Sequence, residues 1–429
     1  MKNLVYYIWK NRLFPLSGLK TTSGENIRII DNGKDEERRD VFNNAKIRIG
    51  NNVWAGNVIL HNKSSDWEHE MRMNAGHKDN VILHVTLEND CDVLRRHGEE
   101  VQQLCLHYSP ALQEEISGAI EKRTRLSCAQ ALSRTESVKL HNILSRLLVE
   151  RMEEKARKIE ALHMEHGQRW EETLFRTMVR SFGFSIQGQA FEEWANTLDL
   201  TSLGKHRDNP VQIEAAFFGQ AGLLEEESIP YYYRECAKRE NYYNELKREY
   251  AFLERKFNLK RMDYRRWGNA GMPHQRIARL AAIYYCHKFS LSYIAECNTT
   301  EELRSVIDTP LHGYWHNHLC FGGTETCGSP GMKQKQVEVI IINAVAPVLY
   351  VYGKHRKEDR LCEKAEDILH TLKCEENSIV RRWKEQGISA ECAADSQALL
   401  QLSKYYCSGG KCAECQFAHH YIKSMLECG

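Results

Sequence analysis

The sequence has almost no net charge and no long uninterrupted apolar run, and both absences exclude classes of protein. The formal net charge of the 429 residues is +1, so no overall field attracts nucleic acid or an anionic membrane, and such binding requires a local patch. The most apolar stretch, 337–352, contains Glu338, Asn343 and Pro347 and is shorter than a membrane-spanning helix. We expect it to form a buried core helix, and we expect no membrane partner.

Familiar catalytic motifs and secretion signals are missing as well. The sequence has no Gly-rich phosphate loop, no Gly-x-Ser-x-Gly elbow and no His-Glu-x-x-His pair. The N-terminal apolar run is interrupted by Lys10 and Arg12, and no small-residue cleavage site follows it. The sequence therefore predicts a cytoplasmic protein, in which the fifteen cysteines are free thiols or metal ligands rather than disulfides.

Alternation of apolar and polar residues in the first quarter of the chain predicts a small mixed sheet. The expected elements are a helix, three strands, a short helix that begins with a capping box, and a fourth strand, at 4–9, 26–31, 45–50, 53–61, 66–73 and 80–87. From about residue 112, apolar residues recur at helical spacing. We therefore predict an α+β protein with a mixed-sheet domain of α-β-β-β-α-β order at 1–111 and an all-helical body at 112–429.

Short strings along the whole chain resemble those of an uncharacterised bacterial family, a domain of unknown function. The strings are 7–10, 44–47, 54–58, 65–67, 81–85, 170–172, 205–209, 218–222, 396–399 and the C-terminal cysteines. The resemblance covers nearly the full length, and it implies no established activity.

The pattern of that family in turn resembles the PD-(D/E)xK nucleases, whose restriction-endonuclease-like core has the same element order. In those enzymes an Asp and a Glu hold a divalent cation such as Mg²⁺ beside the scissile phosphate. This chain keeps the Asp as Asp40, but Ile59 replaces the expected Glu ahead of His61. Isoleucine cannot bind a hard cation. Either the site is inactive, or an acidic residue of the next helix substitutes, the candidates being Asp66, Glu68 and Glu70.

A purely structural interpretation of these residues stays open. Asp40 is then a loop or turn residue, and His61 is a sheet histidine bonded to a backbone carbonyl. The nuclease-like interpretation predicts a nucleic-acid-associated protein with weak or no phosphodiesterase activity.

Three cysteines near the C-terminus have the spacing of metal ligands. Cys412 and Cys415 form a Cys-x2-Cys turn that directs two thiolates at one centre, and Cys407 precedes them across a Gly-Gly loop. A zinc site or a four-iron cluster needs a fourth ligand, for which the candidates are Cys128, His419, His420 and Cys428. One distant cysteine, Cys128, with three near the C-terminus resembles the iron–sulfur staple of some helicase-associated nucleases. The alternative is a set of unliganded, reduced thiols.

Basic and aromatic residues are interleaved around the Gly-rich turn 268–273, a composition that suits phosphate contacts and base stacking. The set comprises Lys260, Arg261, Arg265, Arg266, Trp267, Arg276 and Arg279. A solvated helix face explains it equally well.

Histidines also flank Trp315, for which aromatic loop packing is a better interpretation than a metal site, the residues being His312, His316 and His318. Two functions remain open from the sequence. The protein binds DNA or RNA through a degenerate nuclease-like domain, or it is a non-enzymatic, metal-stabilised helical interaction scaffold.

Overall fold

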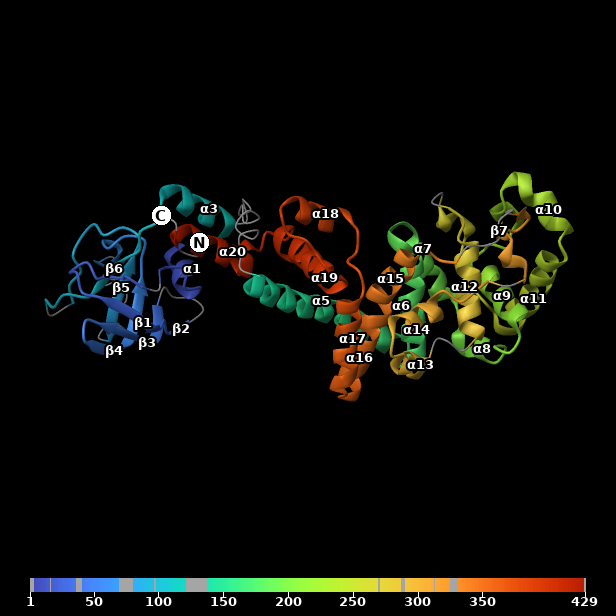
Figure 1. Ribbon diagram of the computed structural model, residues 1–429, viewed down its shortest axis with the longest axis horizontal. Helices are drawn as coiled ribbons and strands as arrows, with labels where there is room; N and C mark the ends of the chain where they lie inside the picture. Colours follow the sequence, from blue (N-terminus) through green and yellow to red (C-terminus); the bar gives the residue numbers. More distant parts are fainter. Residues whose placement is uncertain are drawn as a thin grey trace. The chain divides into compact units, whose positions relative to one another are not determined.

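The chain forms a mixed sheet near its N-terminus followed by many helices (Figure 1), which confirms the predicted α+β class. The computed structural model describes residues 4–15, 17–35, 41–68, 80–95, 98–120, 137–268, 271–286, 290–311, 313–324 and 331–427.

Two compact units divide the chain. The first, here called the sheet unit, comprises 1–147, 378–389 and 399–429, and the second, the helical unit, comprises 148–377 and 390–398. The predicted division into two domains stays a prediction, because compactness alone does not test which segments fold independently.

Four strands of the sheet pair antiparallel, and the strands that follow them pair parallel. The bounds are Ile27–Asp31 (β1), Lys34–Asp35 (β2), Val41–Ile49 (β3), Asn52–Leu60 (β4), Val81–Thr86 (β5) and Gln103–Cys105 (β6). The spatial order is β1-β3-β4-β5-β6, with β2 beside β3, and both β4–β5 and β5–β6 are parallel. Parallel strands need a crossover, which residues 61–80 provide. The helical turn that begins at Asp66 lies in this crossover, as the predicted order requires.

Helix α1 (Leu4–Lys10) covers one face of the sheet (Figure 1). Its Val5 and Ile8 are fully buried, and the ring of Tyr6 lies 5.6 Å from that of Phe42 on β3. A bulge between Phe42 and Ala45 interrupts the pairing of β3 with β4. This bulge adds one residue to β3, so that Phe42 and Ala45, on its two sides, are both buried on the face toward α1.

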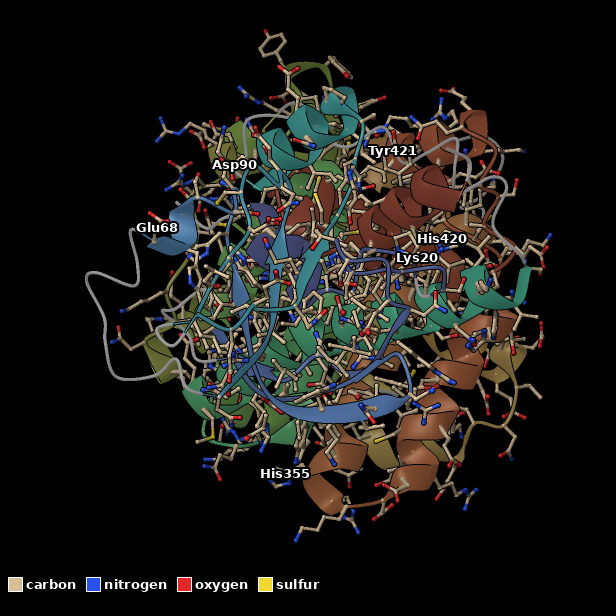
Figure 2. The ribbon with its side chains drawn as sticks, turned by 90° about the vertical axis from the view of Figure 1, so that its left-hand side faces the viewer. Lys20, Glu68, Asp90, His355, His420 and Tyr421 are labelled. Carbon is tan, nitrogen blue, oxygen red and sulfur yellow. The ribbon has the colours of Figure 1, made fainter. Side chains whose placement is uncertain are left out.

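Segments from the C-terminal part of the chain complete the sheet unit. They are α18 (Ser378–Glu385), the end of α19 (Ala393–Gln401), the π-helical turn Leu402–Cys407, the 3-10 turn Cys412–Glu414 and α20 (Gln416–Glu427). Tyr421 of α20 donates to Glu115 of α3 (Pro110–Ile120) at 3.2 Å, and His419 packs on Tyr7 of α1 with ring centroids 5.9 Å apart. The first and last helices of the chain therefore lie together, and Figure 2 labels Tyr421 and His420 on α20.

The helical unit contains most of α5 (Ser137–Glu165) and the helices that follow it. Their bounds are Trp170–Phe182 (α6), Phe184–Thr197 (α7), Leu200–Gly204 (α8), Pro210–Gln220 (α9), Arg234–Arg239 (α10), Asn241–Phe257 (α11), His274–Tyr285 (α12), Leu291–Glu296 (α13), Thr300–Ile307 (α14), Gln334–Ile340 (α15), Ala346–Arg356 (α16) and Asp359–Thr371 (α17). A two-stranded hairpin, His318–Cys320 (β7) and Gly323–Thr324 (β8), is added to them.

The apolar stretch singled out in the sequence forms a continuous helical rod from α15 to α16, through a π-helical turn at Ile341–Val345. By length and composition the 23 residues Gln334–Arg356 can cross a membrane, but 72% of the most apolar window is buried within the structure. Arg304 donates to Glu338 at 2.7 Å, and Lys155 donates to Asn343 at 3.1 Å. The prediction of a buried core helix is confirmed, and its polar residues are bonded inside the unit.

The aromatic interpretation of the residues around Trp315 is also confirmed. Trp315 is buried and stacks on Phe218 with ring centroids 4.7 Å apart, and the ring of Phe321 lies 5.1 Å away. His318 stacks on Tyr314 at 3.7 Å. His312 lies outside the described residues.

Candidate functional site

Strand register gives the neighbours of Ile59, the position at which the nuclease-like resemblance expects a carboxylate. Val41, the first residue of β3, pairs with Ile59 of β4, and Ile59 pairs with His84 of β5. Cross-strand partners place their side chains on the same face of a sheet. Asp40 directly precedes Val41 but lies outside the described residues. Of the three neighbouring positions Val41, Ile59 and His84, the first two are therefore aliphatic.

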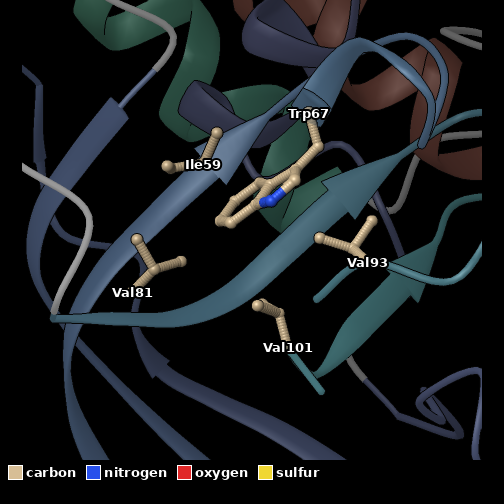
Figure 3. Packing of buried hydrophobic residues seen from close by; sticks show 5 residues of the cluster. All are labelled: Ile59, Trp67, Val81, Val93 and Val101. Carbon is tan, nitrogen blue, oxygen red and sulfur yellow. The ribbon is translucent and has the colours of Figure 1, made fainter. Parts of the chain in front are cut away.

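Apolar side chains fill this position. Ile59 is 2% exposed and belongs to a buried cluster against which Val41 also packs (Figure 3), the other members being Trp67, Val81, Val93 and Val101. Figure 3 shows the indole of Trp67 lying over the sheet beside Ile59. A hydrated cation has no place among these side chains, because a buried charge requires polar partners.

Two histidines adjoin the cluster. Nδ1 of His61 lies 2.9 Å from Nε2 of His84, and both side chains are buried. The rings of His84 and Trp67 are 5.1 Å apart. In such a bond one imidazole nitrogen donates and the other accepts, so at least one of the two rings is neutral. His61 was a candidate from the sequence, but His84 and Trp67 were not. Only the parallel crossover brings these two residues near His61.

Two of the predicted substitute carboxylates, Asp66 and Glu68, point away from the core of the crossover turn. Asp66 and Glu68 are exposed, whereas Trp67 between them is buried, as the 100° step of a helical turn requires. One carboxylate oxygen of Asp66 accepts from the backbone N–H of Lys63 at 3.2 Å, a turn-forming contact. Figure 2 shows Glu68 and Asp90 on the outer side of the sheet unit. Glu70 lies outside the described residues.

A row of basic residues lies on the same face as Ile59 and His84. Arg48 pairs with Val53 and Lys46 with Ala55, which precede Ile59 by an even number of residues on β4 and so lie on its side of the strand, across the irregular pairing near Asn57. Arg28 of β1 stands directly opposite Arg48. All three basic side chains are exposed, and within the described part of the chain none of them forms a salt bridge. We call Arg28, Lys46 and Arg48 the basic row.

The signal for this row was present in the sequence. The strand-like segments 26–31 and 45–50 place basic residues at alternate positions, between isoleucines that are buried at 27, 47 and 49. Alternation alone puts these arginines and the lysine on one face. Only the antiparallel register of β1 with β3 shows that they are neighbours.

The three C-terminal cysteines lie in the same part of the sheet unit, where Cys407 and Cys412 influence the thiol of Cys415 electrostatically. Cys412 and Cys415 are buried, and Cys415 directly precedes α20. The pKa of the Cys415 thiol is raised to about 11, chiefly by burial and also by the neighbouring sulfurs of Cys407 and Cys412, against the opposing effect of the first backbone N–H groups of α20. A side chain at Gly409 would place its Cβ 2.2 Å from the carbonyl oxygen of Tyr405, so the loop between the cysteines requires glycine there.

The described residues contain only some of the candidate metal ligands. Across the described residues, no three histidine, cysteine or acidic side chains surround one point. Cys128 and Cys428 lie outside those residues. Nε2 of His419 is already hydrogen-bonded to the carbonyl oxygen of Ala413 at 3.0 Å. Three thiolates suit zinc or an iron–sulfur cluster, and the metal assignment stays a prediction.

The predicted basic set of the helical unit divides into buried and exposed members. Trp267 is 4% exposed and donates to the carbonyl oxygen of Ala221, and Arg279 is bonded to Asp308 and to the carbonyl oxygen of Thr309. Arg276 donates to the carbonyl oxygen of Phe182 at 3.1 Å. These three side chains therefore hold the helices together.

The exposed members of that set face acidic neighbours. Arg265 makes a bidentate contact with Asp263, Arg261 pairs with Glu225, and Arg266 lies 3.6 Å from Glu193, while Lys260 is exposed. Their contribution to nucleic-acid binding stays a prediction, and the local field at these arginines is partly neutralised.

Comparisons with known proteins give a family and no activity. No curated protein and no solved structure matches the chain. A family model described as "Protein of unknown function (DUF2851)" matches residues 2–378, which include the entire sheet and end before the three cysteines. The resemblance of the short strings to a family of unknown function is thereby confirmed, and the chain belongs to the DUF2851 family.

Proposed function

We propose that the sheet unit binds nucleic acid on the face that carries the basic row, and that it has weak or no ability to hydrolyse the bound strand. The observation that carries this proposal is the combination of the exposed basic row with the apolar cluster around Ile59 on one face of the sheet. The cluster includes Ile59, the position at which the resemblance expects a cation ligand, and this favours binding of a strand over its metal-assisted hydrolysis.

The electrostatics of the basic row favour an anionic partner. Like charges directly opposite each other destabilise a sheet, and Arg28 faces Arg48 in this way. Asp31, the cross-strand neighbour of Lys46, directs one carboxylate oxygen to the backbone N–H of Gly33 at 3.0 Å. A phosphate backbone that spans the row would relieve this repulsion and release counterions.

Fluorescence anisotropy with short labelled DNA and RNA tests the proposal. The variant Arg28→Gln/Lys46→Gln/Arg48→Gln removes three exposed charges and no buried contact, so we expect an affinity about tenfold lower or weaker still. A matched control removes two arginines and one lysine from α18 of the same unit, where all three are exposed, namely Arg381→Gln/Arg382→Gln/Lys384→Gln. Equal losses in both variants would show non-specific attraction and refute the assignment to this face.

We also propose that Cys407, Cys412 and Cys415 hold a structural metal that fixes α20 against α1. The burial of Cys412 and Cys415 near Tyr7 supports this role, because burial, followed by the neighbouring sulfurs of Cys415 and Cys412, raises the pKa of Tyr7. When bound, zinc or an iron–sulfur cluster would supply folding energy rather than chemistry. Without nucleic-acid binding, the same site would fit the alternative of a metal-stabilised interaction scaffold.

A further inference from the structure

A second binding site lies in the helical unit, in a cavity of about 410 Å³ between the start of α6, the short helix α8 and the end of α12. Its volume falls within the range of small-molecule sites, about 300–1,000 Å³. Phe175 and Tyr284 form its aromatic floor; both are buried, and their ring centroids are 6.0 Å apart. The hydroxyl of Tyr284 donates to the carbonyl oxygen of Leu200 at 3.2 Å, which fixes the ring.

Two arginines border the cavity. Arg207 lies over the ring of Tyr284, 4.7 Å from its centroid, and donates through Nε to the Tyr284 carbonyl oxygen at 2.7 Å. Its two terminal nitrogens are not used by that bond. Arg169 spans the opening, with one guanidinium nitrogen on the hydroxyl of Thr201 and another on the carboxylate of Glu172. Both guanidinium groups line the cavity.

The wall formed by α6 is rigid. Glu172 is buried and accepts from Nε and Nη2 of Arg176 at 3.0 and 2.8 Å. Trp170, half-buried at the rim, stacks on His163 with ring centroids 3.8 Å apart, and His163 is bonded to the hydroxyl of Thr173 at 2.9 Å. The side chains that face the cavity are thus held in place before any ligand binds, which lowers the entropic cost of binding.

The first turn of α6 adds hydrogen-bond donors. Arg169 is the N-cap residue of this 13-residue helix, and its side chain does not cap the free backbone N–H groups. Such groups favour an anion. Glu171, exposed in the same turn, also lines the cavity. An aromatic floor, an anion-binding rim and the exposed carboxylate of Glu171 therefore surround the same space.

We propose that this cavity binds a nucleotide. The base packs against the half-buried Trp170 at the rim, above the buried rings of Phe175 and Tyr284. The phosphate accepts from Arg207, from Arg169 once it leaves Thr201, and from the first N–H groups of α6. The carboxylate of Glu171 accepts from a ribose hydroxyl, a pairing that carboxylates make in other nucleotide sites.

This inference does not rest on the proposed function of the sheet unit. The cavity and the basic row belong to different units, and a free mononucleotide is too small to report on a strand laid along the sheet. Loss of oligonucleotide binding in the basic-row variant and loss of mononucleotide binding in a cavity variant are therefore separate results.

Ligand-observed saturation-transfer NMR on the full-length chain, followed by isothermal titration, gives the test. The probes are AMP, GMP, CMP and UMP, with the matching nucleosides and inorganic phosphate. We expect saturable binding of at least one nucleotide, weaker binding of its nucleoside and none of phosphate alone. Arg207→Gln should raise the Kd of that nucleotide tenfold or more and leave the Kd of the nucleoside within about twofold, because the nucleoside has no phosphate for Arg207 to contact.

Two further variants keep the result interpretable. Arg180→Gln removes an exposed arginine at the other end of α6, where it pairs with Glu192, and should leave the Kd unchanged. Glu171→Gln should weaken a ribonucleotide more than its 2′,3′-dideoxy analogue. Absence of saturable binding by all four nucleotides, equal loss of nucleotide and nucleoside in folded Arg207→Gln, or tighter binding of an aromatic amino acid than of any nucleotide would each overturn the proposal.

Discussion

Ile59 is 2% exposed in an apolar cluster, at the position where metal-dependent hydrolysis would require a carboxylate. Ile59→Glu would bury a charge in an apolar cluster, so we expect the free energy of unfolding to fall by about 3 kcal/mol or more. Ile59→Val, the control, should cost about 1 kcal/mol. Urea unfolding measures both. A stable Ile59→Glu variant that cleaves DNA with Mg²⁺ would show that the site is dormant rather than filled.

Glu214 on α9 gives a second prediction for a single residue. Burial raises its pKa to about 7, against the opposing hydrogen bond from Tyr242 at 2.7 Å. The folded state then holds a proton that the unfolded state releases near its ordinary pKa, so stability falls as pH rises from about 4.5 to 7. The loss amounts to about 3 kcal/mol at most.

The variant Glu214→Gln isolates this effect, because glutamine keeps an acceptor for Tyr242 but does not titrate. The stability of the variant relative to the natural chain should increase between pH 5 and pH 7, measured by denaturant unfolding at each pH. A constant difference across that interval would contradict the assignment.

At the scale of elements, the strands that alternate strongly could be predicted, and the contacts between them could not. Segments 26–31 and 45–50 lie in β1 and β3, and β3 buries alternate residues along most of its length. Segments 53–61 and 80–87 became the end of β4 and the fully buried β5 because they are short, continuous apolar runs. The short strands β2 and β6 carry too few residues for a pattern. The pairing of Ile59 with His84 depends on a parallel crossover, and local spacing contains no information about its register.

The C-terminal cysteine loop is the element whose predicted role is most directly measurable. If the three sulfurs hold a metal, Cys412→Ser should remove it and lower the Tm, because structural metal binding contributes on the order of 10 kcal/mol to folding. Cys374→Ser, a partly buried thiol of the helical unit, serves as the control. Elemental analysis and a visible spectrum identify zinc or iron. Full-length protein purified without chelators and free of both metals would contradict the prediction.

At the scale of the whole molecule, the chain passes repeatedly between its two units, at 147/148, 377/378, 389/390 and 398/399. Tyr7 of α1 is buried beside Cys412, Cys415 and His419, all from the far end of the sequence. An isolated fragment 1–111 therefore lacks part of its own core, and we expect it to unfold without cooperativity in circular dichroism. A cooperative transition of that fragment would instead support a domain boundary at 111.

The central proposal is that one face of the sheet unit binds a strand and leaves it intact. The most direct measurement is the affinity for a labelled single-stranded oligonucleotide over a salt series with Mg²⁺ present, with the strand checked for cleavage afterwards. Binding should weaken with salt, the slope of log K against log salt should fall by about 2 when Arg28, Lys46 and Arg48 are neutralised, and the strand should remain whole. Absent or salt-insensitive binding, or cleavage of the strand, would contradict the account.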